Sequence, residues 1–233
     1  MIKQIVIITL SVYFTLCSSS IAGTFRDDFE NEKDFLKDKQ DRVATPWGED
    51  IGSYSWEKGS VKGTNLGSNT CYLLITGDYK WEDYTVECKV NLIRSDNGVG
   101  MVIRRPCIDC NSGYWFGLSV ANRATITYSN GILASSQFEV KLDTWYSFKA
   151  IAQGEKLEFY IDGKQIAEAK DGTYAAGKAG FFACNNCIAL FDDFVMTGPE
   201  VKDGGHWNPK AHSQIDVNTK DKLTATWGRI KSN

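Results

Sequence analysis

Short runs of apolar or alternating residues, separated by turn residues, fill the sequence between residues 24 and 197, and segments with a helical period are nearly absent. This pattern is typical of the strands of a sandwich or barrel. Asn130-Gly131 and Asp162-Gly163 predict tight hairpins, because both pairs accept the positive φ angles that two-residue turns require. We therefore expect one all-β domain over residues 23–199, built from antiparallel sheets.

The first 22 residues have the pattern of a secretory signal peptide. Lys3 precedes an apolar run from Ile5 to Leu16, and Ser20-Ile21-Ala22 fits a cleavage site of small residues. The run is short for a membrane span, and no later stretch approaches the roughly 20 apolar residues that such a helix needs. Cys17 permits a lipoprotein interpretation, but "FTLC" lacks the small residues of such a cleavage site. We expect a secreted protein, extracellular or periplasmic, with a mature chain that begins near residue 23.

The rest of the chain divides at Pro199. Residues 200–217 form a polar stretch with glycine and proline that predicts a linker. In residues 218–233, the spacing of Leu223, Trp227 and Ile230 predicts a short amphipathic helical tail. The tail either docks on its own domain or frays, and the alternative is a contact with a protein partner. A formal net charge of −3 without a basic stripe argues against a nucleic-acid partner.

Six cysteines remain after cleavage at residue 22, and export makes disulfides the default. They are Cys71, Cys88, Cys107, Cys110, Cys184 and Cys187. If "CYLLIT" and "YTVECKV" form a hairpin, Cys71 faces Cys88, and we expect that bridge. The other four form two C-x-x-C pairs, which predict local disulfides. A shared four-cysteine zinc site is the less favoured alternative.

A series of phrases carries a resemblance to a known family. In order they are "FRDDFE", "DYTVECKV", "GVGMVIRR", "GYWFGLSV", "TWYSFKAIAQGEKLEFYIDGKQI", "GKAGFFA" and "ALFDDFV". The order resembles concanavalin A-like jelly rolls of the laminin-G-like type, in particular the secreted domains grouped as 3-keto-disaccharide hydrolase-like. The likeness covers residues 24–199. It implies two stacked antiparallel sheets, one with a concave face, and first and last strands that run side by side.

Two of these phrases repeat a pair of acids beside phenylalanine, at Asp27-Asp28 and at Asp192-Asp193. If the first and last strands are neighbours, the four acids gather at one edge of the sandwich. Related jelly rolls often carry a structural calcium near such acids, and Ca²⁺ prefers oxygen ligands. The four acids are therefore a candidate structural calcium site. The alternative is that the acids cap strand ends or accept backbone N–H groups.

The sequence gives little support for a catalytic site. Its histidines, His206 and His212, lie outside the expected domain, which argues against a Ser-His-Asp or Cys-His arrangement. Jelly-roll glucanases carry E-x-D-x-x-E on one strand. The nearest match here starts at Glu32 but has Lys37 at the third acidic position. No catalytic residue is assigned, although the family resemblance keeps a hydrolytic role open.

Alternation identifies a candidate binding face. If the neighbouring residues point to the core, Arg104, Trp115 and Ser119 face the concave side, and Phe182 joins them. Aromatic faces with a few planar hydrogen-bonding groups are suited to sugars. We expect these four residues to bind the ligand, with loop contacts from Trp81 or Trp47. A register error of one residue would reverse every assignment.

Four other aromatic residues of the domain are expected in the core, namely Trp56, Tyr84, Trp145 and Phe159. The sequence thus predicts a secreted lectin-like domain that recognises glycan on a concave sheet. One alternative is a glycosidase that acts on a 3-keto-disaccharide or a related oligosaccharide. The other is an extracellular adhesion or structural module that binds protein through its tail.

Overall fold

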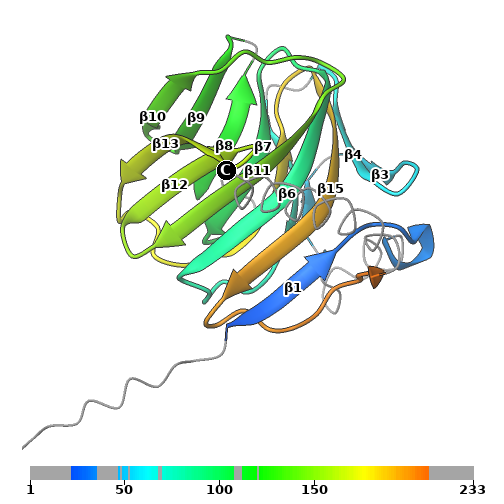
Figure 1. Ribbon diagram of the computed structural model, residues 1–233. Helices are drawn as coiled ribbons and strands as arrows, with labels where there is room; N and C mark the ends of the chain where they lie inside the picture. Colours follow the sequence, from blue (N-terminus) through cyan, green and yellow to red (C-terminus); the bar gives the residue numbers. More distant parts are fainter. Residues whose placement is uncertain are drawn as a thin grey trace, which may run out of the picture.

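A computed structural model shows two antiparallel β-sheets stacked as a sandwich, the fold expected for a jelly roll (Figure 1). It describes residues 22–35, 47, 49–51, 53–67, 70–107, 112–119 and 121–209. The predicted signal peptide and amphipathic tail lie outside the described residues. Within them, no helix has both the length and the apolar character that crossing a membrane requires.

The first sheet, sheet A, has eight strands among the described residues. In spatial order they are β13 (Lys164–Lys170), β12 (Lys156–Ile161), β11 (Trp145–Gln153), β6 (Tyr84–Arg94), β15 (Cys187–Gly198), β4 (Val61–Asn65) and β3 (Ser53–Trp56), with β1 (Gly23–Asp27) also paired to β15.

The second sheet, sheet B, has seven strands in the described part of the chain. Their order is β10 (Gly131–Gln137), β9 (Arg123–Tyr128), β8 (Tyr114–Ser119), β7 (Gly98–Arg105), β14 (Lys178–Ala183), β5 (Tyr72–Thr76) and β2 (Glu49–Ile51). Both predicted hairpins form: β12–β13 turns at Asp162-Gly163 as predicted, whereas β9–β10 turns one residue earlier than predicted, at Ser129-Asn130, because Gly131 already pairs with Tyr128.

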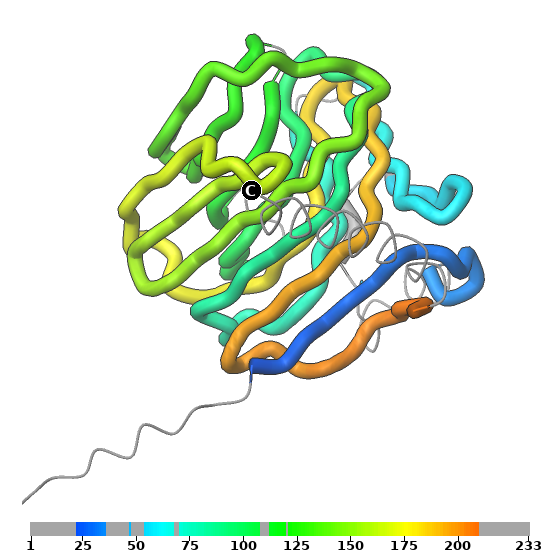
Figure 2. Tube along the Cα trace, in the orientation of Figure 1, coloured from blue at the N-terminus to red at the C-terminus, as the bar shows by residue number. Residues whose placement is uncertain are grey.

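The first and last strands lie side by side, as expected (Figure 2). Their register opposes Asp27 to Phe194 and Phe25 to Met196. The aromatic residues of both phrases enter one cluster between the sheets, in which Phe25 meets Phe194 edge to face at 6.1 Å. The repeated phrase therefore joins the two ends of the domain around a shared aromatic core.

Trp47 lies at the centre of this core, so its predicted role as a rim contact is wrong. Its side chain is fully buried and stacks on Phe181 at 5.3 Å between ring centroids. The indole Nε1 donates a hydrogen bond of 2.9 Å to Oδ2 of Asp27, which is itself 3% exposed. A buried indole N–H needs such a partner. Asp27 thus fixes the central aromatic side chain of the core.

The other expected core aromatics have mixed outcomes. Tyr84 and Phe159 are buried between the sheets, and Trp56 is half-buried against the core. Trp145 is 41% exposed, so its assignment to the core is wrong. Alternation in β11 buries Tyr146 and the following even-numbered positions, which turns Trp145 to the solvent side of sheet A.

The start of the predicted linker is tied to the domain. Residues 201–208 run along β1, with hydrogen bonds from Arg26 N to Gly204 O and from Asp28 N to His206 O, both 3.0 Å. Gly204 N donates to Thr24 O at 3.2 Å, and Val201 is buried. We call residues 201–208 the strap, because they cover the free edge of β1.

Candidate functional site

The outer side of sheet B carries a second apolar cluster, separate from the core between the sheets. Its buried members, the outer cluster, are Leu73, Ile75, Val102, Trp115, Phe182 and Cys184. In β8 and β14 the neighbours Phe116 and Phe181 belong to the core instead. The predicted alternation is therefore correct for Trp115 and Phe182, which both face outward.

Trp115 and Phe182 border a cavity of about 450 Å³. Their rings meet edge to face, with centroids 5.0 Å apart. Trp115 is 8% exposed and Phe182 is 5% exposed, so neighbouring side chains hold both rings in place. The two aromatic residues therefore form walls of a cavity on the outer side of sheet B.

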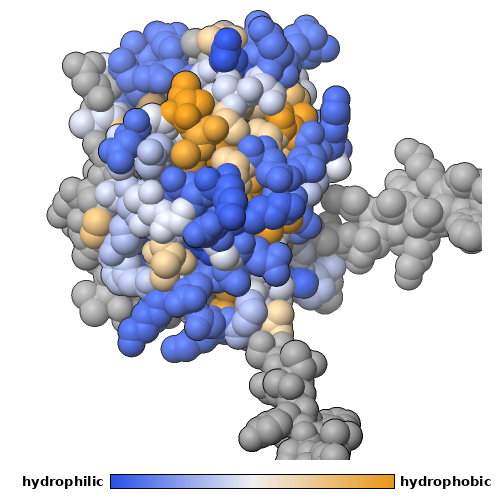
Figure 3. Space-filling view, turned by 90° about the vertical axis from the view of Figure 1, so that its left-hand side faces the viewer, coloured by the Kyte–Doolittle hydropathy of each residue, from blue (hydrophilic) through white to orange (hydrophobic). Residues whose placement is uncertain are grey.

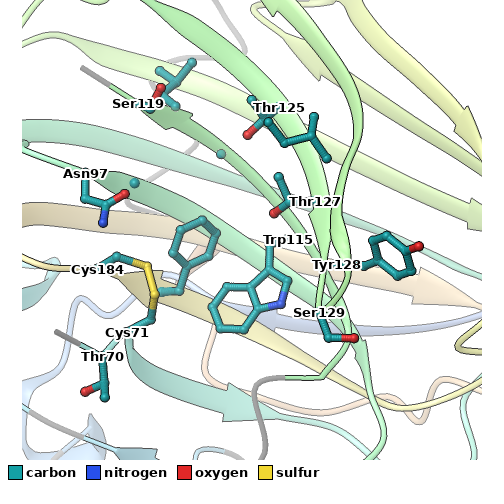
Figure 4. A pocket seen from close by; sticks show the side chains of 15 residues that line it. Thr70, Cys71, Asn97, Trp115, Ser119, Thr125, Thr127, Tyr128, Ser129 and Cys184 are labelled. Atoms are coloured by element: carbon teal, nitrogen blue, oxygen red, sulfur yellow. A yellow bond between two sulfur atoms is a disulfide. The ribbon is translucent and has the colours of Figure 1, made fainter. Parts of the chain in front are cut away.

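Small polar side chains complete the lining. Figure 4 shows Asn97 and the Cys71–Cys184 disulfide on one side of the Trp115 indole, with Tyr128 and Ser129 on the other. The polar residues that line the cavity are Thr70, Asn97, Ser119, Thr125, Thr127, Tyr128 and Ser129. Ser119 thus lies where alternation placed it.

The register of β8 and β9 explains why Trp115 and the polar lining residues lie together. In the β8–β9 ladder, Trp115 is opposite Thr127, and Gly117 is opposite Thr125. Opposed residues point to the same face of a sheet, so the threonine hydroxyls of β9 stand beside the indole. The sequence analysis overlooked this wall. Its signal was the alternation of Thr125 and Thr127 with buried Ala124 and Ile126 in "RATITY".

Gly117 leaves room for the Phe182 ring, which borders the cavity. A Cβ atom at this position would lie 2.7 Å from Cζ of Phe182 and 2.7 Å from the backbone oxygen of Val99. Real Cβ atoms essentially never approach other atoms so closely. The absent side chain therefore allows the Phe182 ring to approach β8 closely.

The cavity is bounded on one side by a disulfide that differs from the predicted one. Cys71 is bonded to Cys184, and Cys88 is a free, buried thiol. The expected Cys71–Cys88 bridge is wrong because β5 and β6 lie in different sheets, so they form no hairpin. β5 pairs with β14 instead, with Tyr72 opposite Ala183, and the next pair in this register is Cys71 with Cys184.

The C-x-x-C predictions are also corrected in part. Cys187 is a free, buried thiol, so the local Cys184–Cys187 bridge is wrong. Cys107 is disulfide-bonded, and Cys110 lies outside the described residues. A sulfur atom in a disulfide supplies no thiolate ligand, so Cys107 and Cys184 do not fit the four-cysteine zinc site in this state.

Arg104 does not reach the cavity, which corrects its predicted role. A register shift between β7 and β14 puts it at φ 49°, and its side chain turns into the domain with 1% exposure. The guanidinium donates to the backbone oxygens of Glu82 at 2.8 Å and Gly154 at 2.7 Å, and to Asp83 Oδ1 at 3.0 Å. Arg104 is therefore a structural crosslink between loops.

Trp81 is likewise a core residue and does not contact the cavity. Its indole is buried in the main core and packs against Gly77, where a Cβ atom would lie 2.8 Å from Cζ3 of the ring. Neither of the two tryptophans proposed as rim contacts is therefore available to a ligand.

The four paired acids lie near the β1–β15 junction but in different surroundings. Asp27 and Asp28 are buried and accept backbone hydrogen bonds from Phe29 and Glu30, among others. Asp193 forms an ion pair with Lys89. Burial, followed by the neighbouring charge of Asp193, raises the pKa of Asp192 to about 7.

Among the described residues, no three histidine, cysteine or acidic side chains are arranged to hold a metal ion. The described acids at the β1–β15 junction are therefore not gathered into a group of three or more. Their hydrogen bonds match the alternative interpretation, in which they serve the backbone. The calcium site stays a prediction.

Figure 3 shows the molecule from the side on which β10, β12 and β13 lie in Figure 1, with an apolar area among hydrophilic residues. One exposed apolar residue of β10, Ile132, is 64% exposed and also lines the cavity. The lining therefore continues from the buried outer cluster to an exposed apolar side chain.

Solved structures with the same fold include several proteins that handle carbohydrate. The carbohydrate-binding module CBM66 from Bacillus subtilis is 15% identical, with a TM-score of 0.55 over 64% of this chain and 92% of that chain. The carbohydrate recognition domain of Emp46p, in its metal-free form, is 13% identical, with a TM-score of 0.54 over 69% of this chain and 91% of that one.

A protein of unknown function with a galectin-like fold, from Bacillus subtilis, is 17% identical, with a TM-score of 0.56 over 76% of this chain and 96% of that chain. No protein-family model and no curated protein sequence matches this sequence. At these identities the structural neighbours establish the fold, a galectin-like and concanavalin A-like β-sandwich. The narrower laminin-G-like and 3-keto-disaccharide hydrolase-like resemblance stays a prediction.

Proposed function

We propose that this chain is a secreted carbohydrate-binding protein that holds part of a glycan in the cavity on the outer side of sheet B. The observation that carries the proposal is the pairing of Trp115 with a wall of hydroxyl groups. An aromatic ring packs against the C–H surface of a sugar, while hydroxyl and amide groups bond its hydroxyls. The cavity volume is within the range of small-ligand sites.

Binding in an extracellular compartment agrees with two further features. The Cys71–Cys184 disulfide persists in oxidising compartments and is rare in reducing ones. The neighbouring structures include a carbohydrate-binding module and a carbohydrate recognition domain, which use the same fold. Because fold alone does not determine function, the proposed function depends on the lining of the cavity.

The first alternative is a glycosidase. Glycoside hydrolysis usually needs two carboxyl groups across the scissile bond. None of the described residues that line the cavity is aspartate or glutamate. This observation favours binding over hydrolysis at this cavity.

The second alternative is an adhesion module that binds protein through the predicted tail, residues 218–233, which lie outside the described residues. Deletion of those residues tests it. Unchanged glycan binding by the shortened protein, together with lost binding to a protein partner, would favour this alternative as an additional role.

The direct test is a glycan array with the mature protein and a Trp115→Ala variant. We expect a loss of affinity of about fivefold to about 150-fold, since a well-packed aromatic ring contributes roughly 1–3 kcal/mol. Trp145→Ala is the matched control, because it removes an indole that is exposed on sheet A. Glycan binding that survives Trp115→Ala in a folded protein would contradict the proposal.

A further inference from the structure

We infer that the cavity selects uncharged glycans and rejects those with carboxylate or sulfate groups. This inference depends on the proposed function and adds the chemical class of the ligand. It concerns which sugars enter the site that Trp115 borders.

The polar lining consists of hydroxyl groups and one amide. None of the described lining residues is arginine, lysine, histidine, aspartate or glutamate. Hydroxyl and amide groups both donate and accept hydrogen bonds, as do the hydroxyls of a neutral sugar. Recognition of a carboxylate or sulfate instead depends on arginine or lysine, which supply charge-assisted bonds.

The apolar part of the lining strengthens the selection. Trp115, Phe182 and Cys184 are nearly excluded from water. An anionic group that enters beside them loses hydration and finds no cation among the described lining residues. The transfer of a charge to such surroundings costs several kcal/mol unless it is paired.

Arg123 is a cation on the same face of β9 as Thr125, and it provides a test of the selection against anionic glycans. Arg123 precedes Thr125 by two residues, so it faces the same side of sheet B, but it is not among the lining residues. Its Nη1 atom donates a hydrogen bond of 2.9 Å to Oγ of Ser135 in the neighbouring strand. Arg123 is therefore directed toward β10, and a neutral ligand in the cavity gains nothing from its charge.

The experiment uses the mature protein and pairs of oligosaccharides with the same backbone. Each pair has a neutral member and a sulfated or uronic acid member, and binding is measured by calorimetry. We expect the neutral member to bind at least about tenfold more tightly, the equivalent of about 1.4 kcal/mol. Its affinity should change less than about twofold between 50 and 500 mM NaCl, because screening acts on charge pairs. Arg123→Gln should leave that affinity unchanged.

Two results separate the inference from the proposed function. Tighter binding of the anionic members, with an affinity that falls with salt and on Arg123→Gln, overturns the inference. In that case, a loss of glycan affinity in the Trp115→Ala variant still supports glycan binding in the cavity. Absence of binding to every member of both classes contradicts the proposed function, and the inference fails with it.

Discussion

The outward faces of the two sheets differ in chemistry although the strands alternate in the same way. On sheet A, outward positions hold charged side chains in ion pairs, such as Lys149 with Glu87 at 3.1 Å. On sheet B, the equivalent positions hold Trp115, Phe182 and the rest of the outer cluster. Exposed ion pairs contribute little beyond solubility. The difference shows that alternation identifies outward positions, whereas the residue types found there identify the face that is suited to a ligand.

The largest expected effect is on stability, and it should differ between a core residue and an outer-cluster residue of sheet B. Phe181 and Phe182 are consecutive, but Phe181 stacks in the core on Phe191 at 4.4 Å. Phe181→Ala should destabilise the fold by about 3–5 kcal/mol, as for other buried phenylalanines. Phe182→Ala should cost roughly half as much, because water from the open cavity can enter the space. Urea unfolding of both variants measures the difference.

Glycan affinity provides the second measurement on the same pair. Phe182→Ala should weaken binding, while any Phe181→Ala protein that remains folded should bind as the parent does. Equal stability losses together with equal affinities would mean that the two faces are not distinct.

The next effect is the loss of stability when the Cys71–Cys184 disulfide of sheet B is removed. Replacement of Cys71 and Cys184 by serine should reduce the free energy of unfolding by roughly 2–4 kcal/mol, because the bond constrains the unfolded chain. The link spans 113 residues of sequence. Reduction of the wild-type protein should give at least as large a loss, because it also breaks the disulfide of Cys107.

Peptide mapping without reduction checks the pairing itself. A peptide that joins Cys71 to Cys184 is expected. A peptide that joins Cys71 to Cys88 would place β5 beside β6 and would contradict the division of these strands between the two sheets.

The last effect is on sheet A, where Asp192 is a partly buried acid. Burial first, then the charges of Asp193 and Glu30, raise its pKa to about 7, against the opposing effects of Lys89 and of the Asp193 N–H hydrogen bond. The folded protein therefore binds a proton that the unfolded chain has released. Stability should fall as the pH rises from about 4 to about 7, with a slope of at most about 1.4 kcal/mol per pH unit.

Asp192→Asn should flatten this slope, and urea unfolding at several pH values measures it. If the parent and the variant lose stability in parallel between pH 4 and 7, another group causes the dependence. In that case, Asp192 would not distinguish sheet A from sheet B.

Much of the fold could be predicted because it depends on local patterns. Alternation and turn pairs predicted the strands, and the family resemblance implied that β1 and β15 are neighbours. Alternation also placed Trp115, Ser119 and Phe182 on the outer side of sheet B. These are properties of consecutive residues, for which a period of two is reliable.

The errors have non-local causes. Arg104 follows a register shift, which breaks the alternation and cannot be read from the sequence alone. Cys71 was assigned to Cys88 because a hairpin is the shortest connection, whereas the actual partner, Cys184, comes from a distant strand. Trp47 was expected at the rim since its flanking residues resemble a loop, and a distant carboxylate, Asp27, anchors it inside.

The strap has a mechanical consequence. It runs parallel to β1, with an isolated parallel bridge between Phe25 and Gly204. Tension that draws Gly23 and Asn208 in opposite directions would slide the two segments past each other. Their hydrogen bonds would then share the load and would have to break together, which resists traction better than peeling them apart one at a time.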